Sequence, residues 1–249
     1  MLAITVLSHM IDNVINKLRF KRKTIEGKLL PNPTATELEV NNWRVSEVVL
    51  KHLVPVVGIH PFPLNELMMQ AGTVVWLEPK YIFEWGTHIG KSARVFFEAT
   101  KAFNIETQIH SIDLPDDVSH AEHPHNDRGK LVRGLPDVYL HQGDGLATAL
   151  GILAKLGTED EKSGGKALFF VDGDHSYESV KRELSGIMKS APGAAILLHD
   201  TFYQSEDSNY NIGPYQAINE CLAASTSKFK RIDTSFGLPG MTLLYPATT

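Results

Sequence analysis

The chain has little cysteine, no excess of basic charge and no long apolar run, and each shortage excludes a class of protein. Its single cysteine, Cys221, excludes an internal disulfide and a cysteine-based zinc site. The formal net charge of −5 argues against nucleic-acid binding, which needs a basic face. No apolar run approaches the roughly 20 residues that span a bilayer. We therefore expect no nucleic-acid partner and no membrane partner.

The start of the chain lacks the marks of a secretory signal. Residues 1–7 are mildly apolar, with no basic region and no convincing cleavage site. Together with the single cysteine, this predicts a reducing, cytoplasmic location. Residues 8–22 then have the pattern of a basic amphipathic helix, either a solvated helix end or a contact for a partner or an acidic ligand.

Short apolar segments alternate with helical patterns over most of the chain, and this alternation predicts a doubly wound, mostly parallel α/β sheet. The last two strand patterns flank Gly237–Gly240, a connection too short for a crossover helix, so the final strand should be antiparallel. We expect an N-terminal helical extension at 1–75, with helices near 37–53 and 64–71, and one α/β domain at 76–249. Strands are expected at 81–84, 107–112, 138–141, 167–171, 194–198, 229–234 and 241–245.

The most informative segment is the apolar run 168–171 followed by Asp172-Gly173-Asp174-His175. It reads as a buried strand that ends in a polar cluster. A second run, 194–198, ends in His199-Asp200. Open α/β sheets bind ligands at the carboxyl ends of their strands, so two such ends predict a chemical site.

A glycine turn follows the first predicted strand, in Glu84-Trp85-Gly86-Thr87-His88-Ile89-Gly90-Lys91-Ser92. It matches neither the G-x-G-x-x-G dinucleotide fingerprint nor a phosphate-binding G-K-[ST] loop. Asp113 ends the next strand, where a carboxylate can accept hydrogen bonds from both hydroxyls of a ribose. Alternatively, Asp113 caps a helix.

These motifs resemble those of class I S-adenosylmethionine-dependent methyltransferases, over residues 81–245. Glu84-x-Gly86-Thr87-x-x-Gly90-x-Ser92 is similar to the family's first motif, Asp113 to its ribose-binding acid, and Gly143-Asp144-Gly145 to the segment beside the adenine. The resemblance implies a Rossmann-like seven-stranded sheet, mostly parallel with an antiparallel last strand, and S-adenosyl-L-methionine as cofactor. The cofactor-binding residues that it implies are Glu84, Trp85, Gly86, Thr87, Gly90, Ser92, Asp113, Asp144 and Asp172.

Within that superfamily, residues 172–177 with His199-Asp200 look most like the metal-dependent O-methyltransferase branch. The similar groups are the macrocin-type sugar O-methyltransferases and the cephalosporin hydroxylase-like or rhamnosyl O-methyltransferase set. This implies a divalent cation at Asp172, His199 and Asp200, Mg²⁺ first and Mn²⁺ as the alternative, because the imidazole departs from the usual pattern. It also implies His175 as the base that takes a hydroxyl proton. The expected acceptor is a hydroxyl of a small molecule, sugar or glycan.

Other roles, mostly structural, stay open for the candidate site residues. His175 could begin a helix or contact the cofactor, Asp172 and Asp200 could be a structural pair bonded to backbone amides, and Asp174 is expected to support the turn. A non-haem hydroxylase-like enzyme and a non-catalytic member that binds the cofactor or a partner are the alternative functions. The segment 115–136, with His120, His123 and His125, is expected to be a lid or a solvated loop, and 203–215 to line the acceptor pocket. The N-terminal helices would form the interface of a homo-oligomer or cover the pocket.

Overall fold

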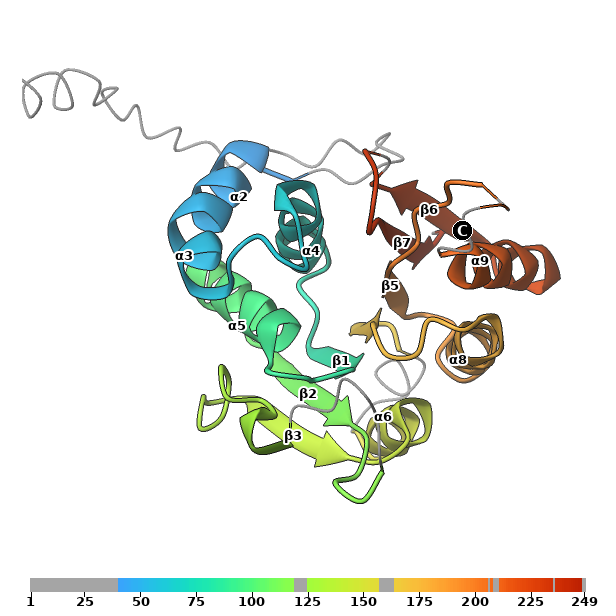
Figure 1. Cartoon of the computed structure of the whole chain (residues 1–249), viewed down its shortest axis with the longest axis horizontal. Coiled ribbons are helices and arrows are strands. Elements are labelled where there is room, and N and C mark those ends of the chain that lie inside the picture. The colour runs from blue at the N-terminus through green and yellow to red at the C-terminus, as the bar shows by residue number, and fades with distance from the viewer. Residues whose placement is uncertain are drawn as a thin grey trace, which may run out of the picture. The chain divides into compact units, whose positions relative to one another are not determined.

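The computed structural model describes residues 40–118, 125–156, 164–205, 207, 211–234 and 236–247 (Figure 1). The chain divides into two compact units, 1–37 and 38–249. All described residues belong to the second unit, which is presented here by itself. The predicted helix at 8–22 and the loop residues His120 and His123 lie outside the described residues.

A single seven-stranded sheet forms the centre of this unit, with strand order β3-β2-β1-β4-β5-β7-β6. Strand β7 lies between β5 and β6 and is antiparallel to both, whereas the pairs among β1 to β5 are parallel. The predicted fold class and the antiparallel last strand are confirmed. The strands are β1 (Tyr81–Trp85), β2 (Gln108–Asp113), β3 (Val138–Gln142), β4 (Ala167–Val171), β5 (Ala195–His199), β6 (Phe229–Asp233) and β7 (Met241–Pro246).

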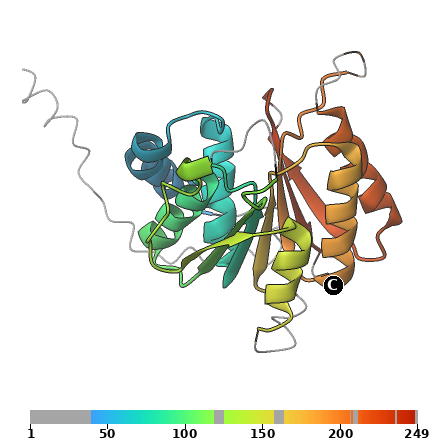
Figure 2. The ribbon, with the colours of Figure 1, turned by 60° about the horizontal axis from the view of Figure 1, so that its bottom comes forward.

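Helices cover both faces of the sheet (Figure 2). Residues of α4, α5 and the segments before them pack on one face, and residues of α6, α8 and α9 pack on the other. Because both faces are covered, the central strands β1, β4 and β5 are buried at every position, which explains their nearly continuous apolar sequences. The helices are α2 (Asn42–Val48), the π-helical turn η1 (Val49–Leu53), α3 (Val54–Val57), α4 (Leu64–Leu77), α5 (Lys91–Phe103), the 3₁₀ turn η2 (His125–Asp127), α6 (Gly145–Leu153), α8 (Tyr177–Ser190) and α9 (Ile212–Ala224).

Helix α4 extends further than the sequence predicted, to Leu77 instead of Ala71. The added turns contain Gly72 and the β-branched residues 73–75, which are poor helix formers. Val74 is fully buried in the same core as the sheet, and this packing outweighs the weak propensity. Helix α4, which spans residues 64–77, packs in the same core as the sheet. The domain boundary at 75/76 stays a prediction. Among the described residues, none of the helices has the length and apolarity needed to cross a membrane.

Candidate functional site

The carboxyl ends of β4 and β5 bring two aspartates to one edge of the sheet. The strands are parallel neighbours, with Val171 opposite Leu198, so the residues that follow them lie close together. Asp172 comes one residue after β4 and Asp200 one residue after β5. Asp200 has a φ of +56°, a left-handed conformation that aspartate tolerates better than most residues do. Such strained positions are common at functional sites.

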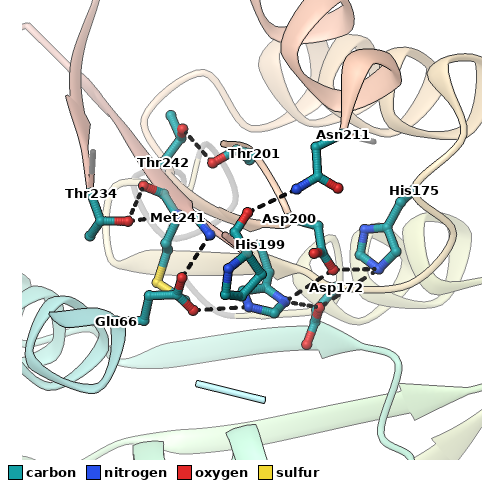
Figure 3. A network of polar contacts seen from close by, with 12 residues as sticks. Glu66, Asp172, His175, His199, Asp200, Thr201, Asn211, Thr234, Met241 and Thr242 are labelled. Atoms are coloured by element: carbon teal, nitrogen blue, oxygen red, sulfur yellow. Dashed lines mark hydrogen bonds and ion pairs between the residues drawn. The ribbon is translucent and has the colours of Figure 1, made fainter. Parts of the chain in front are cut away.

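His175 points into the space between the two carboxylates (Figure 3). Its Nε2 lies 3.2 Å from Oδ2 of Asp200 and 4.0 Å from Oδ1 of Asp172. One potential ligand atom from each of the three residues lies within 4.8 Å of the others. The aspartate side chains are 16% exposed and His175 is 37% exposed, so solvent reaches the cluster. The two carboxylate oxygens fit a cation such as Mn²⁺ or Mg²⁺, and the imidazole nitrogen beside them can either complete its ligand set or accept a proton.

His199 occupies a different place, behind the carboxylates. Its Nδ1 lies 2.9 Å from Oδ1 of Asp172, its Nε2 lies 3.0 Å from Oε2 of Glu66, and only 4% of its side chain is exposed. Burial by itself lowers the pKa of His199, but the charge of Asp172 and hydrogen bonds to Asp172, Asp200 and Glu66 outweigh it and hold that pKa well above its usual range. Both nitrogens of His199 thus face carboxylate oxygens, Nδ1 those of the two aspartates and Nε2 that of Glu66. His199 contacts the two aspartates from the buried side and His175 from the exposed side, and the metal role of His199 stays a prediction.

Glu66 is a site residue that the sequence analysis did not single out. It lies in the first turn of α4 and is fully buried. Its second oxygen, Oε1, accepts a hydrogen bond of 2.8 Å from the backbone N–H of Gly240. The signal in the sequence was a lone carboxylate within a mostly apolar helix, Leu64–Leu77, because charged residues are rarely buried unless paired.

The turn that carries His175 is fixed by its own side chains. Asp174 accepts hydrogen bonds from the backbone N–H of Ser176 at 3.0 Å and from its hydroxyl at 2.9 Å. Ser176 in turn caps α8 by accepting from the N–H of Ser179. The expectation that Asp174 supports the turn is confirmed, and the two carboxylates of the Asp-Gly-Asp segment have separate surroundings.

The glycine turn follows β1 and packs against the end of β4. Gly86 has a φ of +92°, and an added Cβ would lie 2.0 Å from the carbonyl oxygen of Asp172. Gly90 has a φ of +86° and forms the N-cap of α5, where a Cβ would lie 2.9 Å from Val132. Both glycines are required here because other parts of the same chain approach them closely.

Glu84 and Trp85 point to opposite faces of β1. Glu84 is fully buried and accepts a hydrogen bond of 2.5 Å from the hydroxyl of Ser111, while its Oε2 has no hydrogen-bond partner among the described residues. Burial raises the pKa of Glu84 to about 7, although hydrogen bonds from Ser111 and Ser92 oppose the shift. Thr87 adds its hydroxyl to this group, 2.6 Å from that of Ser111. The Trp85 indole instead packs on Phe169 in the core.

Asp113 lies beside the glycine turn, as the motif predicts. Its carboxylate accepts from the backbone N–H of His88 at 3.1 Å and of Leu114 at 2.8 Å, and Nε of Arg128 lies 3.3 Å away. It caps none of the described helices. A carboxylate has about four acceptor positions, so these three contacts leave room for a hydroxyl.

Asp144 is the N-cap of α6 and accepts from the N–H of Ala147 at 2.8 Å. Burial alone would raise the pKa of Asp144, but hydrogen bonds from Arg182 and Ala147 lower it.

The segment after Asp200 is only partly described. Tyr203 and Tyr215 stack with their ring centroids 4.4 Å apart, and Asn211 donates to the carbonyl of Pro239 at 2.9 Å. Glu206 and Asn209 lie outside the described residues. The pocket-lining role of residues 203–215 therefore stays a prediction.

Comparison with known proteins relates this chain to methyltransferases. Residues 83–201 match the family model described as a methyltransferase domain (Methyltransf_24). No curated protein matches the chain. Solved structures with the same fold include an O-methyltransferase from Bacillus cereus in complex with SAH (16% identity, 95% of this chain and 97% of that one, TM-score 0.51). They also include the SAH-bound methyltransferase PaMTH1 from Podospora anserina (16% identity, 89% and 100%, TM-score 0.51).

The O-methyltransferase TomG from Streptomyces achromogenes, in complex with SAM, is another similar structure (18% identity, 84% of this chain and 91% of that one, TM-score 0.50). Identities this low establish the fold alone. The segment 83–201, which contains the glycine turn, Asp113 and both strand-end aspartates, thus matches a methyltransferase domain, and the chain has the Rossmann-like fold of O-methyltransferases.

Proposed function

We propose that this protein is an S-adenosylmethionine-dependent O-methyltransferase that activates a hydroxyl group with a divalent cation. The observation that carries the proposal is the convergence of Asp172, Asp200 and His175 beside the glycine turn. S-adenosylmethionine supplies the methyl group when bound. Asp113, Asp144 and the turn from Glu84 to Ser92 would hold it, and Glu84 Oε2 and the remaining acceptor capacity of Asp113 fit a ligand with hydrogen-bond donors.

The cluster would lower the cost of removing the hydroxyl proton. Asp172 and Asp200 would hold Mg²⁺ or Mn²⁺, whose charge would stabilise the developing alkoxide or phenolate. Nε2 of His175 lies beside the same carboxylates and would accept the hydroxyl proton while the methyl group passes from sulfur to oxygen. The products are a methyl ether, S-adenosylhomocysteine and a proton on His175.

The arrangement favours this chemistry over hydroxylation. A non-haem iron hydroxylase needs two histidines and one carboxylate around the metal. Within the described part of the chain, the cluster holds one histidine and two carboxylates, and both nitrogens of His199 face carboxylate oxygens. We propose that the acceptor is a small molecule, sugar or glycan, that the chain works as a cytoplasmic homo-oligomer without nucleic-acid or membrane partners, and that residues 76–249 form the catalytic domain.

Labelled S-adenosylmethionine, Mn²⁺ or Mg²⁺ and a panel of hydroxylated acceptors test the reaction. We expect methyl transfer that stops with EDTA, in Asp200→Asn and in His175→Ala. Asparagine keeps the shape and tolerates the left-handed backbone at position 200, so its effect reports the lost charge. Glu178→Gln is the matched control, because it removes the charge of an exposed carboxylate three residues after His175, in the first turn of α8. Transfer that persists in EDTA would remove the cation from the mechanism.

Cofactor binding is tested separately by calorimetry with S-adenosylhomocysteine. Asp113→Ala should abolish binding. Asp116→Ala is the matched control, since Asp116 also pairs with Arg128 but lies beyond the strand end. Equal binding by wild type and Asp113→Ala would contradict the cofactor assignment. Binding without transfer to any acceptor would identify a non-catalytic member.

A further inference from the structure

Glu66 holds His199 from the side opposite the candidate site. The two residues are 133 positions apart in the sequence, and the 3.0 Å contact between Oε2 and Nε2 is buried. Phe62, from the segment just before α4, packs edge-on against the same imidazole with ring centroids 4.8 Å apart. Helix α4 and its approach therefore hold the ring by its edge and by one nitrogen.

The other nitrogen of His199 contacts the two aspartates of the candidate site. Nδ1 lies 2.9 Å from Oδ1 of Asp172 and 3.4 Å from Oδ2 of Asp200. The imidazole thus touches both aspartates on the side away from solvent, while His175 faces them from the exposed side (Figure 3). A ring fixed in this way sets where the two carboxylates lie relative to each other, as outer partners do for metal-binding groups.

We propose that Glu66 is a positioning residue of the active site: through His199 it fixes Asp172 and Asp200 in the arrangement that binds the cation. The inference rests on the proposed function for its catalytic consequence. It makes α4 a part of the site although this helix precedes the segment that matches a methyltransferase domain. A carboxylate offers both of its oxygens to partners, one to His199 and one to the N–H of Gly240, whereas an amide offers only one acceptor oxygen.

The same helix supplies a matched control. Gln70 lies one turn after Glu66 on α4 and is equally buried, but its amide has no hydrogen-bond partner among the described residues. Gln70→Met replaces it by an apolar side chain of similar length. This change alters the packing of α4 without touching His199.

The experiment compares the wild-type chain with Glu66→Gln, Glu66→Asp and Gln70→Met. Glutamine keeps the volume and can still accept from Gly240, and aspartate keeps the charge but is one methylene too short to reach both partners. Three quantities are measured: the imidazole N–H signals of His199 in the ¹⁵N NMR spectrum, Mn²⁺ affinity by electron paramagnetic resonance, and kcat and KM for methyl transfer. Circular dichroism and S-adenosylhomocysteine binding verify that each variant is folded.

We expect both Glu66 variants to shift or lose the His199 signals and to lower Mn²⁺ affinity or kcat by roughly 10- to 100-fold. S-adenosylhomocysteine binding should be unchanged, and Gln70→Met should match the wild type throughout. Folded Glu66 variants with wild-type His199 signals and Mn²⁺ affinity would overturn the proposal, because a merely structural residue affects only stability. If the wild type fails to bind Mn²⁺ or to methylate, the proposed function fails. The NMR signals then decide by themselves whether Glu66 positions His199.

Discussion

Replacing Gly86 with alanine should destabilise the protein where the glycine turn packs against the end of β4. The backbone at this position has a φ of +92°, and an L-residue in the left-handed region costs about 1–2 kcal/mol. The new Cβ would also lie 2.0 Å from the Asp172 carbonyl oxygen and 2.9 Å from its carbon. These are backbone atoms that cannot rotate away, and overpacking of this kind costs about 1–3 kcal/mol.

The two costs add to roughly 2–5 kcal/mol, which corresponds to roughly 4–20 °C in melting temperature for a chain of this size. Urea unfolding followed by circular dichroism measures the loss. Gly134→Ala is the control, because Gly134 has a similar φ of +82° but no atom within 4 Å of an added Cβ. It should show the backbone cost alone.

The difference between the two variants isolates the contact with Asp172. If Gly86→Ala and Gly134→Ala lose the same free energy of unfolding, the close approach of the two strand ends is not what requires glycine. A second consequence concerns the site, since the clash falls on the backbone of Asp172, whose side chain is one of the proposed cation ligands. Gly86→Ala should therefore weaken Mn²⁺ binding, and Gly134→Ala should leave it unchanged.

Three further predictions concern stability. The pKa of Glu84 is about 7 in the folded chain, against an ordinary value of 4.5. Its contribution to the free energy of unfolding is therefore complete below pH 4.5 and is lost as the pH rises to about 7. Urea unfolding across this range should show a decline of about 3 kcal/mol in the wild type that Glu84→Gln removes. Asp144→Ala should cost about 1 kcal/mol by removing the cap of α6, whereas Asp144→Asn, which loses only the exposed pair with Arg182, should stay within about 0.5 kcal/mol of wild type. Calorimetry should show a loss of about 3–5 kcal/mol for the fully buried Phe170→Ala, and almost none for Phe236→Ala, because Phe236 is 91% exposed; equal losses would contradict the assigned core.

The strands were predictable because each one carries its own signal. β4 and β5 are short apolar runs that end in charged residues, and the structure places their bounds within one residue of the prediction. The meeting of Asp172 and Asp200 depends on β4 and β5 being neighbours, which the resemblance to class I methyltransferases implied and the strand pairing confirms.

The partners within the site were not predictable from spacing. The sequence places His199 next to Asp200, which suggests a shared ligand set, but alternation along β5 and the turn after it point the two side chains differently. His199 turns toward α4, where a buried carboxylate satisfies its second nitrogen. Glu66 itself lies 133 residues away, and no local pattern links it to the strand ends. Contacts of this kind depend on how α4 packs on the sheet, and the sequence pattern predicted that helix only as far as Ala71.

The hydrogen bond between Glu66 and Gly240 has a consequence for how the protein folds during its synthesis. It joins residues 174 positions apart, and Gly240 immediately precedes β7, which inserts between β5 and β6. During synthesis, β1 to β5 can pair before β7 exists, yet Glu66 would then lack one of its two partners. Contacts that span so much of the chain form late, so the second oxygen of Glu66 gains this partner only after the last strand has been made. A chain truncated before Gly240 would contain every candidate ligand residue. It would still lack the backbone N–H that holds Glu66, so the site would be incomplete.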